Sequence, residues 1–224
     1  MSVKKIKKER KSKRAKPSEP LFIAIEGGEG SGKSSLLNAL KEKLGDAIHI
    51  TREPGGSEFG EAIRESALKH PLSKNAQAET MICLMFAARF DHVDKLIKPT
   101  LEKRKHVITD RFDASSYAYQ IHAQEAGHLE KLFWHLRSAI SKTPDLYIYM
   151  NVDAEEGIRR AATRNAQVLL VGNHFDEREL AFHKRLRKGY DNFFKKVKHV
   201  VIDANRPFEK VKKDFFKVID GILK

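Results

Sequence analysis

The chain has 224 residues, 41% of them hydrophobic, with a single cysteine and a formal net charge of +13. This length and apolar share suit one α/β domain with a sizeable core. The lone Cys83 excludes an internal disulfide, and its apolar neighbours predict a buried thiol in a reducing, cytoplasmic compartment. No apolar stretch approaches the length that spans a bilayer, and the first residues lack the apolar segment of a secretory signal, so we expect no membrane contact.

The first segment along the chain, residues 1–20, is predicted to be a basic, disordered tail. Seven lysines and two arginines stand there against Glu9 and Glu19, so the tail holds +7 of the net charge. A run with so few apolar residues cannot bury enough surface to offset the entropy lost on ordering. We expect residues 21–224 to form the single folded domain. For the tail, we favour a solvated extension over weak contact with nucleic acid or another polyanion.

A glycine-rich phosphate-binding loop follows the tail and organises the domain. Its spacing from Gly27 to Ser34 is G-x-x-x-x-G-K-S, a pattern in which backbone N–H groups close around phosphate oxygens. Such a loop needs a strand before it and a helix after it, and both are predicted, from the apolar run 21–25 and from the leucines after Ser34. Lys33 then reaches the β- and γ-phosphates, and the Ser34 hydroxyl binds Mg²⁺. The expected nucleotide-binding residues are Gly27, Gly28, Glu29, Gly30, Ser31, Gly32, Lys33, Ser34 and Ser35.

Four more short strands are predicted, and they alternate with helices. They cover residues 47–51, 106–109, 146–150 and 200–203. The strands and the helices between them have the lengths of a parallel sheet covered on both faces, which is an α/β fold. Ligands bind at the carboxyl edge of such a sheet, and the strand at 106–109 delivers Asp110 and Arg111 to that edge.

Helical patterns fill the connections between the strands. The longest covers residues 76–98 and is stopped by Pro99. Another begins at Asp153 and Glu156, which have the spacing of a capping box. Helical patterns also cover residues 113–139 and 208–223.

A phosphate-binding loop alone leaves open a GTPase, an ATPase motor or a small-molecule kinase. The chain has no N-K-x-D element and no D-x-x-G switch after a strand, which argues against a GTPase, and it is short for a motor. Arginines gather instead where a second, anionic substrate would face the triphosphate, and arginine pairs bidentately with phosphate and with planar base edges. These arginines are Arg52, Arg64, Arg89 and Arg111.

Six motifs in chain order resemble those of the thymidylate kinase family. They are FIAIEGGEGSGKSS, TREPGGSEFGEAIRE, LMFAARFDHV, ITDRFDASSYAYQ, PDLYIYMNVDAEEGIRR and VIDANRPFEKV, and the resemblance covers nearly all of residues 21–220. It implies the P-loop kinase fold, a five-stranded parallel sheet flanked by helices on both faces, with a helical lid at about residues 160–178. It also implies a homodimeric enzyme that phosphorylates dTMP to dTDP with the γ-phosphate of ATP and Mg²⁺, in dTTP synthesis.

The family resemblance implies roles for residues on the catalytic side of the site. Arg111 is expected to hold the acceptor phosphate, with Asp110 beside it ordering the magnesium shell. Glu29 is expected to face the sugar 3′-hydroxyl or a metal-bound water. The catalytic residues implied are Lys33, Arg111, Arg164 and Glu29, and the metal-binding residues are Ser34 and Asp110.

The resemblance also implies how the acceptor nucleotide is held. Phe86 is expected to stack on thymine while Arg89 donates to its O4. Tyr119 and Gln120 are expected to line the sugar and base, with Tyr119 placed to exclude a 2′-hydroxyl. The substrate-binding residues implied are Glu53, Arg64, Phe86, Arg89, Arg111, Ser116, Tyr119 and Gln120.

The acceptor side departs from the family's pattern at two places. Phe86 stands three positions before Arg89, where relatives have four. Either Phe86 is shifted by a fraction of a turn or Met85 takes the stacking place, and both spacings keep the pair on one side of a helix. The glycine-rich turn that relatives have after Tyr-Gln is replaced by residues 121–123.

The lid departs most from the family's pattern. His174 stands where relatives have an arginine, and a mostly neutral imidazole cannot replace a guanidinium. We hypothesise that Arg164 is the lid arginine, with Arg160 and the more distant Arg185 as other candidates. The departures keep two other functions open. One is a related nucleoside monophosphate kinase with an altered acceptor, and the other is a nucleotide-binding protein with weak catalysis that associates with nucleic acid through its tail.

Overall fold

The structure, a computed structural model, describes residues 19–168 and 179–223, with side chains at 164–168 left out. Residues 1–18 and 169–178 lie outside this description. The tail and most of the segment expected as the lid, His174 included, therefore stay predictions. Within the described ranges, no helix combines the length and apolar character that crossing a bilayer needs.

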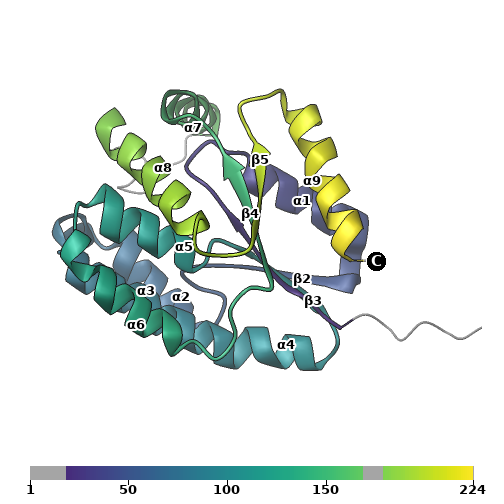
Figure 1. Cartoon of the computed structure of the whole chain (residues 1–224), viewed down its shortest axis with the longest axis horizontal. Coiled ribbons are helices and arrows are strands. Elements are labelled where there is room, and N and C mark those ends of the chain that lie inside the picture. The colour runs from purple at the N-terminus through teal and green to yellow at the C-terminus, as the bar shows by residue number, and fades with distance from the viewer. Residues whose placement is uncertain (1–18, 169–178, 224) are drawn as a thin grey trace, which may run out of the picture.

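Five parallel strands form one sheet, as predicted. In space their order is β2-β3-β1-β4-β5, so β1 lies at the centre, between β3 and β4 (Figure 1). From β1 the chain continues to β2, at one edge of the sheet, and from β4 it continues to β5, at the other edge. Where the direction reverses in this way, the loops part and leave a crevice for ligands. The strands are β1 (Phe22–Glu26), β2 (Ile48–Arg52), β3 (His106–Asp110), β4 (Leu146–Asn151) and β5 (His199–Asp203).

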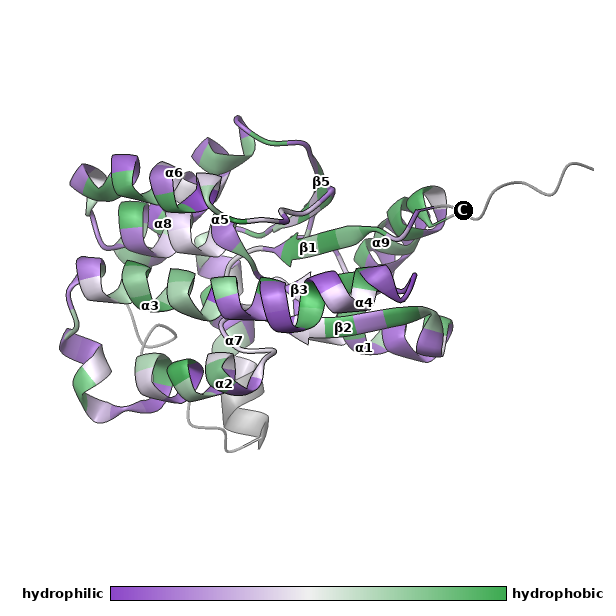
Figure 2. Ribbon diagram, turned by 90° about the horizontal axis from the view of Figure 1, so that it is seen from below, coloured by the Kyte–Doolittle hydropathy of each residue, from purple (hydrophilic) through white to green (hydrophobic). Residues whose placement is uncertain are grey.

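Helices cover both faces of the sheet. Along β1, Phe22 and Ala24 face a core made with helices α3, α5, α6 and α8, while Ile23 and Ile25 face a second core made with α1 and α9. This explains why the strand is hydrophobic from Phe22 to Ile25 (Figure 2). The helices are α1 (Lys33–Leu44), α2 (Glu58–Arg64), α3 (Ala78–His92), α4 (Lys98–Glu102), α5 (Asp113–Ser116), α6 (Glu130–Ser138), α7 (Ala154–Val168), α8 (Leu180–Phe194) and α9 (Phe208–Ile222).

Pro99 does not stop the helix that precedes it, so this prediction is wrong. After α3 the chain passes through a π-helical turn, Val93–Ile97, and continues into α4 as far as Glu102. The wider turn is closed by the Lys98 N–H, which donates to the Val93 carbonyl oxygen. Pro99 then stands in the first turn of α4, where a missing N–H costs little.

Cys83 is exposed, which corrects the prediction of a buried thiol. The core side of α3 carries Met81, Ile82, Met85 and Phe86, which follow the three- and four-residue spacing of one helix face. Position 83 lies off that stripe. Its apolar neighbours in sequence therefore did not determine its burial.

Helix α8 packs on a π-helical segment, Tyr117–Ala123, through Gly189. A Cβ added at Gly189 would lie 2.7 Å from the Ala118 Cα and 2.8 Å from the His122 Cβ. Both are closer than carbon atoms approach in proteins without movement. The close contact of α8 with this segment therefore depends on the absence of a side chain.

We predict that Gly189→Ala lowers the free energy of unfolding by about 1–3 kcal/mol, because the methyl group overpacks this contact. Gly221→Ala is the matched control, since Gly221 lies in α9 and a Cβ added there would have nothing within 4 Å. There, alanine is expected to leave stability unchanged or to raise it by up to about 1 kcal/mol through helix propensity. Urea unfolding of the two variants and the parent measures both effects. Equal stability of the two variants would contradict the packing argument.

Candidate functional site

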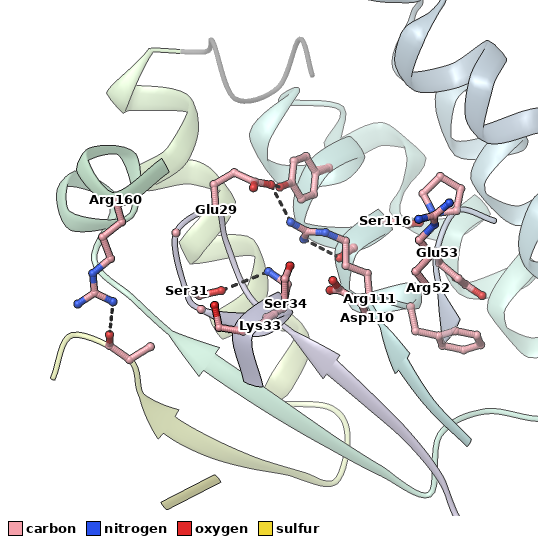
Figure 3. Close-up of a pocket in the computed structure, with 18 of the residues that line it drawn as sticks. Glu29, Ser31, Lys33, Ser34, Arg52, Glu53, Asp110, Arg111, Ser116 and Arg160 are labelled. Atoms are coloured by element: carbon pink, nitrogen blue, oxygen red, sulfur yellow. Dashed lines mark hydrogen bonds and ion pairs between the residues drawn. The ribbon is translucent and has the colours of Figure 1, made fainter. Parts of the chain in front are cut away.

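A pocket of about 650 Å³ lies at the carboxyl edge of the sheet. Its wall comes from the glycine-rich loop, the segment after β2, α3, the segment after β3, α7 and the segment after β5. Figure 3 shows Ser31, Lys33 and Ser34 toward one end and Glu53 and Ser116 toward the other. Most of the expected donor and acceptor residues therefore share one pocket.

The glycine-rich loop turns back over the start of α1. Gly27, Gly30 and Gly32 all have positive φ angles, of 148°, 67° and 84°, which side chains rarely allow. The loop also touches the first turn of α7, because a Cβ on Gly30 would collide with the carbonyl oxygen of Gly157. The reverse also holds, since a Cβ on Gly157 would lie 2.6 Å from the Glu29 carbonyl oxygen.

Lys33 is held inside the curve of this loop. Its Nζ donates to the carbonyl oxygens of Gly27, at 2.9 Å, and Gly28, at 3.1 Å, and to Ser31 Oγ at 3.2 Å. Burial, with the nearby Arg111 guanidinium, lowers the pKa of Lys33 below its usual value. Phosphate oxygens suit such a group, because they offer negative charge to a desolvated cation.

Arg111 stands between the loop and the acceptor end of the pocket (Figure 3). Its Nη2 donates to Glu29 Oε1 at 2.7 Å, and its Nη1 donates to the Gly27 carbonyl oxygen at 3.0 Å. Tyr119 OH donates to the same Glu29 oxygen at 2.9 Å. The structure thus brings Glu29 together with Arg111 and Tyr119, which follow it by 82 and 90 positions in the sequence.

Asp110 and Ser34 are the residues expected to bind a metal, and both line the pocket. Asp110 Oδ1 is buried and has no hydrogen-bond partner among the described residues. Those residues contain no group of three or more His, Cys, Asp or Glu side chains that could hold a metal ion. The buried Asp110 oxygen and the Ser34 hydroxyl are donors of the kind that suits Mg²⁺, which takes one or two protein oxygens and completes its shell with water and substrate phosphates.

The acceptor end is lined by most of the residues predicted for it. Arg64 Nη1 donates to the Pro54 carbonyl oxygen at 2.8 Å, which fixes its guanidinium at the wall. Gln120 Oε1 is buried without a hydrogen-bond partner in the described part of the chain. The predicted residues that line the pocket are Glu53, Arg64, Arg89, Arg111, Ser116, Tyr119 and Gln120.

Phe86 is not part of the pocket wall, which corrects its predicted stacking on the base. Its side chain is 1% exposed, and its ring lies 4.7 Å from the Arg89 guanidinium carbon and 5.6 Å from the Phe133 ring. Phe86 and its neighbour Met85 point in directions about 100° apart around the helix, so only one of them can face the pocket squarely. The four-residue position is Met85, which lines the pocket together with Met81. The alternative with Met85 in the stacking place agrees with this geometry.

The candidate lid arginines are placed differently from one another. Arg160 lines the pocket, but its Nη1 donates to the Ala204 carbonyl oxygen at 2.7 Å and its Nε to Glu156 at 2.6 Å. Arg185 donates to the Ala123 carbonyl oxygen and does not line the pocket. The Arg164 side chain lies outside the described residues.

The capping box expected at the start of α7 does not form. The Asp153 N–H donates to Asn205 Oδ1 at 2.9 Å, while the Glu156 carboxylate binds Arg159 and Arg160. Glu156 therefore organises two arginines at the pocket wall.

Two buried residues that the sequence interpretation missed support Arg111. Glu26 accepts the Phe112 N–H at 2.7 Å and the Ser115 hydroxyl at 2.7 Å, and Tyr190 OH accepts from Arg111 Nη1 at 3.0 Å. Burial raises the pKa of Glu26 to about 7, against the hydrogen bond from Ser115 and the charge of Arg111. A charged residue that ends an apolar strand was a signal for Glu26. Tyr190 had none, because α8 was not predicted.

A family model for thymidylate kinase matches residues 25–215 of the chain. The chain belongs to the thymidylate kinase family. Relatives over most of its length agree. The thymidylate kinase of Bacillus licheniformis is 37% identical over 210 residues, which are 91% of this chain and 97% of that protein. The thymidylate kinase of Chlamydia caviae is 36% identical over 84% of this chain and 92% of its own length.

A solved structure supports the same fold. The crystal structure of thymidylate kinase from Ehrlichia chaffeensis matches with a TM-score of 0.69 at 26% sequence identity. The match covers 91% of this chain and 99% of that one. The predicted α/β class and five-stranded P-loop kinase sheet are thereby confirmed.

We predict that Glu26→Gln changes how stability depends on pH. The Glu26 carboxyl has a pKa of about 7 in the folded chain against 4.5 ordinarily, so the folded state favours its protonated form. Protonated Glu26 contributes its full share to the free energy of unfolding below pH 4.5, and this share is lost as the pH rises to 7. The loss amounts to up to about 3 kcal/mol, and the glutamine variant does not undergo it. The free energy of unfolding, measured in urea at pH 5 and pH 8, should fall more steeply in the parent.

The exposed Glu102, changed to glutamine, is the control for the loss of one negative charge. Its pH dependence should follow that of the parent. Parallel curves for the parent and Glu26→Gln would contradict the raised pKa.

Proposed function

We propose that this chain transfers the γ-phosphoryl group of ATP to the 5′-phosphate of dTMP, giving dTDP and ADP. Its membership of the thymidylate kinase family makes it an enzyme of this class. The observation that carries the proposal is the shared pocket, in which Lys33 lies inside the phosphate-binding loop and Arg111 stands between that loop and the acceptor end. The reaction serves dTTP synthesis.

The chemistry asks for alignment and positive charge rather than for proton transfer. The acceptor is already an anionic phosphate, so the protein needs no nucleophilic side chain and no general base. Lys33 and the backbone N–H groups of the loop hold the donor phosphates, and Arg111 holds the acceptor phosphate. Their combined charge neutralises the transferring group as it passes between them.

Mg²⁺ is part of this proposal, with Ser34 and Asp110 as its protein ligands. The buried Asp110 Oδ1, which has no hydrogen-bond partner among the described residues, supports this role. When bound, the ion would supply positive charge that neutralises the charge developing on the donor phosphate. Glu29 faces the sugar 3′-hydroxyl or a metal-bound water.

The acceptor base is proposed to lie between methionine side chains and the Arg89 guanidinium. Met81 and Met85 give an apolar wall for a pyrimidine ring and its methyl group, and Arg89 donates to O4. Tyr119, held by its hydrogen bond to Glu29, stands where a 2′-hydroxyl would reach. Glu53, Arg64, Ser116 and Gln120 complete the wall.

A coupled assay for ADP release tests the acceptor. Turnover with dTMP, dUMP, dCMP and dGMP at equal concentration is expected to be highest with dTMP. A higher rate with another monophosphate would favour the related kinase with an altered acceptor. No ADP from ATP and dTMP, together with salt-dependent DNA retention lost on deleting residues 1–20, would favour the nucleotide-binding alternative.

We predict that Arg164→Ala lowers kcat by about 10³-fold, because a lid arginine neutralises charge on the transferring phosphoryl group. Arg185→Ala is the matched control, since Arg185 is bound to the Ala123 carbonyl oxygen away from the pocket. Its kcat should stay within a few-fold of the parent. Steady-state rates with saturating ATP and dTMP measure both. A kcat within a few-fold of the parent in Arg164→Ala would remove Arg164 from the mechanism.

Three further parts of the proposal concern the whole protein. A homodimer packed through helices follows from the family resemblance, and sedimentation equilibrium tests it. For residues 1–20 a solvated extension stays the favoured proposal, and weak contact with nucleic acid or another polyanion is the alternative that their charge leaves open. A cytoplasmic location is supported by the single cysteine.

A further inference from the structure

A chain of buried polar side chains leads from β2 to the acceptor pocket. His92 Nε2 lies 2.8 Å from Thr51 Oγ1, and His92 Nδ1 lies 3.0 Å from Glu53 Oε1. Glu53 Oε2 in turn accepts from Arg89 Nε at 2.7 Å. His92 is fully buried and Arg89 is 2% exposed, so water does not compete for these contacts.

Arg89 is held on two of its three nitrogens. Besides the bond from Nε to Glu53, its Nη2 donates to the Phe112 carbonyl oxygen and to Ser116 Oγ, both at 3.0 Å. Nη1 is buried and has no hydrogen-bond partner in the described part of the chain. Arg89 also lines the pocket. A guanidinium only donates, so Nη1 offers N–H groups to an oxygen or ring-nitrogen acceptor and repels an amino group.

The His92 ring can hold the Glu53 carboxylate in only one way. Glu53 accepts from Arg89, and a carboxylate accepts hydrogen bonds without donating, so we assign the hydrogen to His92 Nδ1. Gly56 closes the other side of the ring, because a Cβ there would collide with His92 Nε2. The ring is therefore fixed in position as well as in its hydrogen bonds.

We propose that His92 is a positioning residue for the acceptor base, acting through Glu53 on Arg89. His92 Nδ1 holds Glu53 Oε1 in place, and this also fixes Glu53 Oε2, which accepts from Arg89 Nε. The direction of Arg89 Nη1 is fixed as a result. This selects a pyrimidine with a carbonyl oxygen at position 4 over one with an amino group there. The inference rests on the proposed function, because it concerns the same acceptor site.

A residue that only filled the core would act differently. His92 is the last residue of α3 and is fully buried against Thr51 of β2, so its replacement by any smaller side chain would lower stability. Loss of stability alone would affect dTMP and ATP alike. A positioning role predicts instead a loss of affinity for dTMP but not for ATP. The size of that loss should depend on whether the new side chain replaces Nδ1 or Nε2 of the ring.

Two variants separate the two nitrogens of His92. In His92→Asn the amide nitrogen can stand near the place of Nδ1 and keep the bond to Glu53. In His92→Gln the longer side chain reaches the place of Nε2 and leaves Glu53 without its second donor. His106→Gln is the control for losing a partly buried histidine, because His106 Nδ1 accepts the Leu21 N–H at the start of β3, outside the pocket.

The readouts are the Kd of dTMP by calorimetry, the KM values of dTMP and ATP, kcat, and the dTMP:dCMP ratio of kcat/KM. His92→Gln is expected to raise Kd and KM for dTMP about tenfold, since a hydrogen bond to a charged group is lost, and to leave the ATP KM within twofold. The dTMP:dCMP ratio should fall by a similar factor. His92→Asn should recover most of the dTMP affinity, and His106→Gln should match the parent.

Two results would overturn the inference. One is an equal change in dTMP affinity in His92→Asn and His92→Gln. The other is a parallel change in the ATP and dTMP KM values in His92→Gln. Failure of the proposed function is a separate outcome, since the parent would then release no ADP with dTMP. Thermal melting of every variant identifies any that does not fold. If a His92 variant does not fold, Thr51→Val replaces it in the experiment, because this change removes only the hydroxyl partner of His92 Nε2. The expected loss of dTMP affinity in Thr51→Val is smaller than in His92→Gln.

Discussion

The guanidinium of Arg111 is the interaction on which the pocket depends, because it ties the phosphate loop and α8 to the segment that follows β3. It donates to the Gly27 carbonyl oxygen in the phosphate loop, to Glu29 in the same loop, and to Tyr190 on α8. Its own backbone has a φ of 71° and is bonded to the end of β1 through the Ile25 carbonyl oxygen. A partly desolvated cation needs a carboxylate, and Glu29 supplies one. An acceptor phosphate at this place would therefore compete with Glu29 for the same N–H groups.

Much of the fold could be predicted from the sequence, for physical reasons that differ between elements. Strands buried on both faces read as unbroken apolar runs, and the spacing of the phosphate loop is set by where its glycines must turn. Helix α8 was not predicted, and Gly189 gives one reason. A glycine weakens a helical pattern, yet here the approach of α8 to Ala118 requires it. At Pro99 a helix end was predicted where there is none, because the π-helical turn before the proline lets the helix continue.

The site could be predicted as a set of residues more fully than as a set of contacts. The residues expected at the acceptor end do line the pocket, except for Phe86, because the family motifs lie in the loops and helical segments that follow β2 and β3. The rotation of α3 about its axis decides whether Phe86 or Met85 faces the pocket. The spacing to Arg89 alone did not determine that rotation, so the sequence left both residues as candidates. The bond between Glu53 and His92 joins residues 39 positions apart. No local pattern marks such a pair, and the same holds for Glu26 beneath Ser115 and Tyr190.

The contact between Gly30 and Gly157 has a consequence for the dimensions of the donor side. At this point the phosphate loop and the first turn of α7 touch backbone to backbone, since a methyl group on either glycine would meet a carbonyl group of the other segment. The two glycines thus act as one spacer, although they are distant in sequence. Their missing methyl groups set how near α7 stands to the bound phosphates. Bulk at Gly157 would therefore widen the donor end without altering any residue of the phosphate loop.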